Sequence, residues 1–169
     1  MGNSKNIFAN ASFTRDRDQF LRELIRELCS VLEATVGVRE AEGFIALVGG
    51  RMGEIMNREY RTEAGQKKLD LCQIADALVD LKRRINGGFS IESIDERQIV
   101  LVNTACPFGD YVKDRPSLCM MTSNVFGRIA ADNLGYANVE LKETIAQGDA
   151  GCRVIIRFEE CESGRDYFG

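Results

Sequence analysis

Residues 106–152 read CPFGDYVKDRPSLCMMTSNVFGRIAADNLGYANVELKETIAQGDAGC and hold three of the six cysteines and both prolines of the chain. The pattern predicts an irregular loop, then a helix over about 117–133, and then two strands that face each other across residues 147–150. The three thiols therefore belong to a loop, a helix start and a strand start. The rest of the chain has to fold so that these three segments meet.

The chain before this stretch is helical in pattern. Apolar residues recur at steps of three and four with charged residues between them, which is typical of amphipathic helices. We expect three such helices, over about 14–36, 40–60 and 62–85. After Gly88 the period changes to alternation, which predicts a hairpin that turns around residues 95–97.

Four glycines lie within the second predicted helix, at positions 43, 49, 50 and 53. Each glycine inside a helix costs up to about 1 kcal/mol relative to alanine. We expect them to serve close packing against another helix, with a break of the helix near Gly49 or a backbone surface for a ligand as alternatives.

The expected element order is three helices, two strands, one helix and two strands. This order describes an α+β fold in which N-terminal helices pack on an antiparallel sheet. We expect a flexible leader over residues 1–13, one domain over 14–160 and a short solvated tail over 161–169. A chain of 169 residues can bury roughly two thirds of its unfolded surface, so no disulfide framework is needed.

Composition excludes several functions. The net charge is -4 and no dense basic surface is present, so direct nucleic-acid binding is not expected. The longest apolar runs are too short to span a membrane and no signal-peptide pattern begins the chain, which predicts a cytoplasmic protein without membrane contact. The absence of histidine excludes Ser-His-Asp and Cys-His catalysis and every histidine-containing zinc site.

The cysteines at positions 106, 119 and 152 have several possible roles. In a reducing compartment they are expected to be free thiols, metal ligands or redox groups rather than structural disulfides. Cys119 lies in the first turn of a predicted helix, where the helix dipole favours a thiolate. The spacing matches no short zinc knuckle or ferredoxin run. A zinc or iron–sulfur centre, a thiol redox switch and plain core packing all remain open.

Apolar side chains near these cysteines predict a pocket for a small ligand, because methionine adapts to irregular shapes. The candidate pocket residues are Phe108, Met120, Met121, Ser123, Asn124 and Phe126. Methionine and phenylalanine at helical spacing are also typical of an ordinary core, so both interpretations stay open.

A cysteine hydrolase is the enzymatic alternative. Cys106 or Cys119 would be the nucleophile, and Asp110, Asp114 or Glu143 would assist it. Without histidine, one of these carboxylates would need an unusual pKa to act as the base. A regulatory role is therefore favoured over catalysis.

Three short sequence segments resemble the methanogen output domain, a family of sensory modules. They are NTACPFG, LCMMTSNVFGRIAA and GDAGCRVIIRF. The segment from Leu141 to Cys152 also resembles the vinyl-reductase type of small-molecule-binding domain. The resemblance covers roughly residues 40–160. It implies a mixed fold with an antiparallel sheet, related to subunits of vesicle-tethering complexes, usually dimeric, with an apolar pocket and often a cysteine-bound zinc beside it.

Carried over residue by residue, the resemblance implies metal ligation by Cys119 and Cys152. Thr144 stands where the vinyl-reductase pattern has another cysteine, so Cys106 becomes the candidate third ligand, with Glu143 or Asp149 as the fourth. We therefore expect a cytoplasmic sensory domain with a zinc or iron–sulfur centre or a small ligand. It would form a homodimer through its N-terminal helices and signal to a separate signalling or transcription protein.

Overall fold

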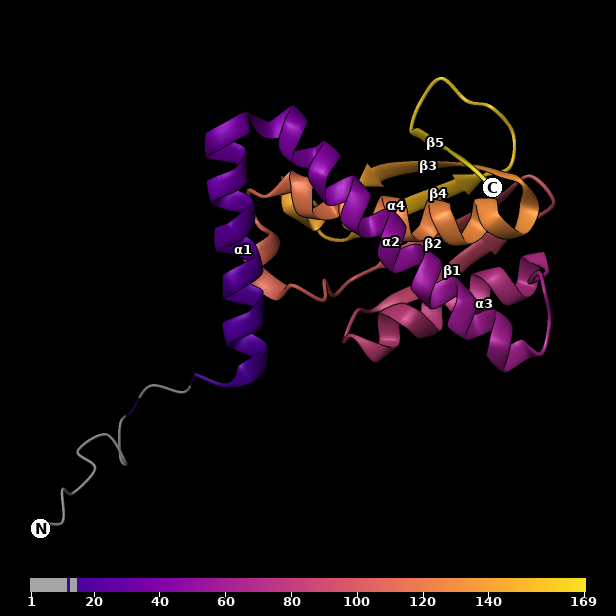
Figure 1. Cartoon of the computed structure of the whole chain (residues 1–169), viewed down its shortest axis with the longest axis horizontal. Coiled ribbons are helices and arrows are strands. Elements are labelled where there is room, and N and C mark those ends of the chain that lie inside the picture. Colours follow the sequence, from indigo (N-terminus) through magenta and orange to yellow (C-terminus); the bar gives the residue numbers. More distant parts are fainter. Residues whose placement is uncertain (1–11, 13–14) are drawn as a thin grey trace, which may run out of the picture.

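A five-stranded antiparallel sheet forms one layer of the fold, and helices form the other (Figure 1). The structure is a computed structural model that describes Ser12 and residues 15–169, so nearly all of the predicted leader lies outside the described residues. The strands are β1 (Phe89–Ile94), β2 (Gln98–Asn103), β3 (Tyr136–Glu143), β4 (Cys152–Arg157) and β5 (Arg165–Phe168), in the spatial order β1-β2-β4-β3-β5. The predicted α+β class is confirmed.

The helices are α1 (Arg17–Val36), α2 (Val38–Ala64), α3 (Leu71–Arg84) and α4 (Pro116–Leu134). Helix α4 lies on the sheet against β3 and β5, and α2 crosses over α4. Helix α3 packs against β1 and α4, whereas α1 packs against α2 and a short 3₁₀ helix, η1 (Gly109–Val112). Figure 1 shows α1 standing at one end of the molecule, beside the sheet layer rather than over it.

The helix boundaries follow local capping signals. The Asp16 carboxylate accepts a hydrogen bond from the Gln19 backbone N–H at 2.7 Å and starts α1. The third helix begins at Leu71, not near residue 62 as predicted, because α2 continues to Ala64 and ends at Gly65 with φ +65°. A reciprocal capping box between Asp70 and Gln73 then starts α3.

Two of the four glycines of α2 face α4, and the other two, Gly43 and Gly50, have no neighbour within 4 Å of an added Cβ. A Cβ on Gly49 would lie 2.8 Å from the Asn124 Cβ, and a Cβ on Gly53 would lie 2.8 Å from the Arg128 Cβ. These two glycines therefore let α2 approach α4 closely. The expectation of close helix packing is confirmed, and α2 has no break at Gly49.

The buried core lies between α3, α4 and one face of the sheet. Its fully buried large side chains include Ile74, Leu78, Ile99, Leu101, Phe126, Ile129, Val139, Val154 and Ile156. No helix in the described part of the chain is long and apolar enough to cross a membrane.

The predicted tail contains a strand. Residues Arg165–Phe168 form β5, which pairs with β3 so that Tyr136 lies opposite Phe168. The Tyr167 ring rests on Gly127 of α4, and its hydroxyl is 2.8 Å from the Ser123 hydroxyl. The prediction of a solvated tail is wrong. The four residues of β5 include two charged side chains and show no apolar alternation, so the sequence does not indicate a strand. Backbone pairing with β3 and the packing of Tyr167 hold β5 in place.

Replacing Gly127 with alanine should loosen β5 from α4. A Cβ at this position would lie 2.2 Å from the Tyr167 ring, so the ring and its strand have to move. We expect the free energy of unfolding to fall by about 1–3 kcal/mol, the usual cost of overpacking. Urea unfolding followed by circular dichroism measures it. Alanine is the better helix former by about 1 kcal/mol, so any loss reports the lost contact.

The matched control is Tyr167→Phe, which keeps the ring and removes only the hydrogen bond to Ser123. It should cost about 0.5–1.5 kcal/mol. A Gly127→Ala protein more stable than the wild type by about 1 kcal/mol, the helix-propensity gain alone, would show that Tyr167 does not pack at this position.

Candidate functional site: a cavity with three cysteines

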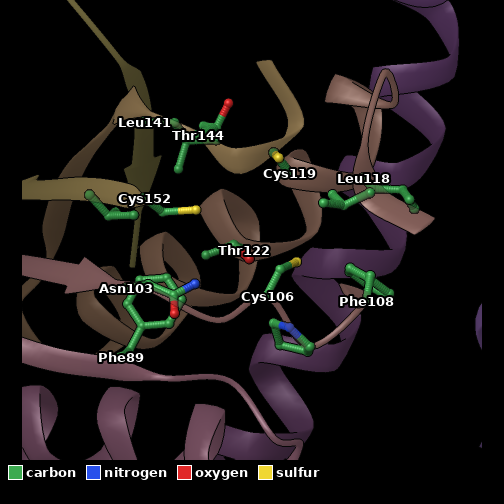
Figure 2. Close-up of a pocket in the computed structure, with 13 residues that line it drawn as sticks. Phe89, Asn103, Cys106, Phe108, Leu118, Cys119, Thr122, Leu141, Thr144 and Cys152 are labelled. Atoms are coloured by element: carbon green, nitrogen blue, oxygen red, sulfur yellow. The ribbon is translucent and has the colours of Figure 1, made fainter. Parts of the chain in front are cut away.

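A small, partly open cavity lies where the loop after β2, the start of α4 and the start of β4 meet (Figure 2). Its volume is about 30 Å³, which is room for roughly two water-sized particles. The lining residues are Phe89, Asn103, Cys106, Pro107, Phe108, Val112, Leu118, Cys119, Thr122, Leu141, Thr144, Cys152 and Val154. We call this space the thiol cavity, and the lining is apolar apart from the three thiols and a few amide and hydroxyl groups.

The fold brings the three predicted cysteines of residues 106–152 to this one cavity. Cys106 comes from the loop between β2 and η1, Cys119 is the fourth residue of α4, and Cys152 is the first residue of β4. Figure 2 shows their side chains placed around the same space. All six cysteines of the chain are free thiols.

The predicted fourth ligands lie elsewhere. Glu143 is exposed at the end of β3, with its Oε1 4.0 Å from the Arg153 Nε, and the Asp149 carboxylate accepts the Thr144 backbone N–H at 2.7 Å. Neither residue lines the thiol cavity. In the described residues, no three Cys, Asp or Glu side chains are gathered closely enough to coordinate one ion.

Thr144 has an unusual position at the cavity wall. Its side chain is 5% exposed, and its Oγ1 is buried without a formed hydrogen bond. The hydroxyl still lies near enough to the Cys119 sulfur to lower the pKa of that thiol. A buried hydroxyl without a partner usually costs about 1–3 kcal/mol, so this atom is a contact available to whatever occupies the cavity.

The fold does not activate the Cys119 and Cys106 thiols. Burial, together with the smaller effect of the neighbouring Cys152 and Cys106, raises the pKa of Cys119 to about 12. Burial also raises the pKa of Cys106, although the nearby Phe108 backbone N–H acts in the opposite direction. The expectation that the helix start lowers the Cys119 pKa is wrong, because desolvation outweighs the dipole. A hydrolytic nucleophile needs a lowered pKa or an adjacent base, so the geometry does not favour a hydrolase.

Lys82 of α3 is the charged residue behind the cavity wall, and sequence reasoning missed it. Its side chain is 5% exposed, and its Nζ donates a 2.7 Å hydrogen bond to the Thr122 Oγ1. The Nζ lies 5.5 Å from the centre of the Phe89 ring and 5.1 Å from that of Phe126. Burial lowers the pKa of Lys82 to about 8, while the three cavity cysteines raise it.

A signal for Lys82 is present in the sequence. The buried stripe of α3 has apolar residues at steps of three and four, and Lys82 occupies the next position of that stripe after Leu78. A lysine on the buried side of a helix indicates a special environment, because lysine is almost never fully buried without a partner.

The predicted ligand-pocket residues are spread over several environments. Phe108 lines the thiol cavity, and the other five do not. Phe126 packs edge-to-face against Phe89 in the core, Ser123 bonds Tyr167, and Asn124 donates to the Met120 backbone oxygen. Met120 and Met121 pack in the apolar cluster around the cavity without reaching it.

Comparisons with known proteins place the fold and the family. In structure, the chain is similar to trafficking protein particle complex subunit 3 from Naegleria fowleri, which was solved covalently bound to palmitic acid. The TM-score is 0.57 at 15% identity, over 87% of this chain and 99% of that chain, a level that shows a shared fold. No curated protein matches the chain in sequence. The family model described as methanogen output domain 1 matches residues 24–157, and the chain belongs to this family of small output domains.

Proposed function

We propose that this output domain is regulated by a thiolate-bound metal centre in the thiol cavity. The observation that carries the proposal is the convergence of Cys106, Cys119 and Cys152 on one small cavity. Thiolates are soft ligands that favour zinc and iron, and the absence of histidine leaves the cysteines as the natural donors. The unpaired Thr144 hydroxyl is a further contact at the same wall.

The residues fit such a centre in chemistry, and binding of a single ion requires the sulfurs to move inward. Cys106, Cys119 and Cys152 would hold it, and a bound metal would supply a cross-link between the loop, α4 and β4. The raised pKa values of Cys106 and Cys119 make this binding depend on pH, since each thiol has to lose a proton. The affinity of the thiol cavity for the metal should rise with pH, because binding releases the thiol protons.

The cavity volume disfavours a larger ligand. Pockets for small organic molecules measure about 300–1,000 Å³, whereas this cavity measures about 30 Å³. An acyl chain like the palmitic acid of the Naegleria fowleri protein has no room here. A metal ion is small enough for the space once the sulfurs move inward, and an iron–sulfur cluster requires the cavity to open. The same three thiols would serve a redox switch if two of them paired on oxidation.

We propose that α1 is the surface through which the domain signals. The polar side of this helix faces the rest of the protein. Arg26 donates hydrogen bonds to the carbonyl oxygens of Tyr111 and Lys113 at 2.7 and 2.8 Å. Arg115 donates to the Ser30 hydroxyl, with its Nε at 3.0 Å. The exposed apolar residues of α1 are Phe20, Leu21, Leu24, Ile25, Leu28, Val31 and Val36. A helix with its polar side inward and its apolar side in water has a surface suited to a partner.

We take that partner to be a second copy of the chain. Leu21, Leu24, Leu28 and Val31 follow steps of three, four and three, the spacing by which two like helices pair in a coiled coil. Helix α2 adds exposed apolar residues, among them Phe44, Leu47, Val48, Met52 and Ile55. A symmetric dimer places identical surfaces against each other, so one apolar stripe serves both subunits.

The cavity and α1 are joined by the same loop. Tyr111 and Lys113, which accept the Arg26 hydrogen bonds, lie between Cys106 and Cys119. Cys29 of α1 packs with Val112 and Leu118, which also line the cavity. A metal that draws Cys106 and Cys119 together therefore shifts the loop that anchors α1. The signal passes from the dimer to a separate signalling or transcription protein in the cytoplasm, where the thiols stay reduced.

Elemental analysis of the full chain, purified without oxygen, tests the metal centre. We expect about one zinc, or an iron–sulfur cluster with its brown colour and broad visible absorption, per chain. Cys119→Ser should remove it, and Cys72→Ser, which changes an exposed cysteine outside the cavity, should not. A metal-free wild type with three reactive thiols, two of which pair on mild oxidation, would replace the metal proposal with the redox switch.

Sedimentation velocity tests the dimer. We expect the wild type to sediment at twice the 18.8 kDa chain mass and Leu28→Glu to sediment as a monomer with an unchanged circular dichroism spectrum. Leu28 is 60% exposed, so the carboxylate costs little in the monomer and prevents apolar pairing in the dimer. Ile91→Glu, on β1 and away from α1, is the control and should stay dimeric. A wild type that is monomeric at high concentration would contradict the proposed second copy.

A further inference from the structure

Lys82 carries a charge that the described structure leaves without a carboxylate partner. Among the described residues, the ion pairs are made by arginines and by Lys113. Asp80, the acidic residue two positions earlier on α3, pairs with Arg83 and Arg84 instead. A buried ammonium without an opposite charge is costly, so the groups that do face Lys82 decide what balances it.

The groups that face Lys82 come from three elements and one loop. Thr122 of α4 accepts its hydrogen bond, and the rings of Phe89 on β1 and Phe126 on α4 lie against the ammonium. The titratable groups whose charge acts on it are Cys106 in the loop, Cys119 on α4 and Cys152 on β4. The cavity cysteines are therefore the groups in reach that can become negative.

The charge of a three-thiolate centre matches that of Lys82. Three thiolates with a doubly charged ion, or with a cluster core of the same charge, carry one net negative charge. We propose, on the basis of the metal centre proposed above, that Lys82 is the positioning charge that balances this centre and selects for an assembly with one net negative charge. Thr122 fixes the ammonium on the cavity side, since it both lines the cavity and accepts the lysine hydrogen bond.

The test compares Lys82→Met with Lys82→Arg in the full chain. Methionine fills a similar volume without charge, and arginine keeps the charge. Zinc affinity, measured without oxygen by competition with a chromogenic chelator, should fall by about tenfold or more in Lys82→Met, because one lost charge interaction of about one pKa unit is a factor of ten. Lys82→Arg should retain more of the affinity than Lys82→Met. Lys113→Met, which removes an exposed lysine, is the control and should bind as the wild type.

A second readout uses the metal-free protein. The thermal unfolding of the wild type and of Lys82→Met is followed by circular dichroism without added metal. The metal-free Lys82→Met protein should melt at or above the wild-type temperature, because an uncompensated buried charge is gone.

The outcomes separate the two proposals. If the wild type binds zinc and Lys82→Met binds it equally well, the role of Lys82 is overturned while the metal centre stands. If the wild type binds no zinc or iron, the metal centre fails. The role of Lys82 then fails with it, since there is no centre for the ammonium to balance. A Lys82→Met protein that melts lower and binds zinc as tightly as the wild type would show a merely structural lysine.

Discussion

The close contact between α2 and α4 is the constraint on which the site depends. At Gly49 and Gly53 the backbone of α2 comes so near to α4 that a single added carbon would meet a side-chain carbon at 2.8 Å. Helix α4 is thereby fixed between α2 and the sheet. Its start delivers Cys119 to the cavity, and its next turn delivers Thr122 to both the cavity and Lys82. The position of Cys119 therefore depends on the packing of α2 against the next turns of α4.

Inside the cavity, desolvation is stronger than every local charge effect. Burial raises the pKa of Cys119 to about 12 although the thiol lies at a helix start and near an ammonium. The same burial lowers the pKa of Lys82 to about 8. Burial therefore favours the neutral forms of the Cys106 and Cys119 thiols and of the Lys82 amine. In the proposed metal-bound form, the metal ion would replace the thiol protons and leave a net negative charge on the thiolate centre. That charge would favour the protonated form of Lys82, and the protonated lysine would in turn favour metal binding.

The sequence allowed prediction of what depends on periodicity and on local chemistry. The alternation of apolar residues after Gly88 predicted the first hairpin. The segments around Cys106, Cys119 and Cys152 were predicted to meet, and the fold does bring them to one cavity. The sequence did not predict β5, because pairing with β3 is a property of the assembled sheet rather than of four residues. Lys82 was overlooked for a related reason: it is one of three consecutive basic residues in the last turn of α3, and only its position in the apolar stripe decides its burial.

The amphipathic pattern of α1 does not predict which side of the helix faces the protein. Apolar residues at steps of three and four normally face the protein's own core. Here Arg26 and Glu33 lie on the inner side, where Arg26 bonds loop carbonyls and Glu33 pairs with Arg115. An interface of this polar kind is less costly to rearrange than an apolar one, because water can replace the hydrogen bonds that are lost. The contact between α1 and the loop that carries Cys106 is therefore one that can change without unfolding the core, which is what the proposed signalling through α1 requires.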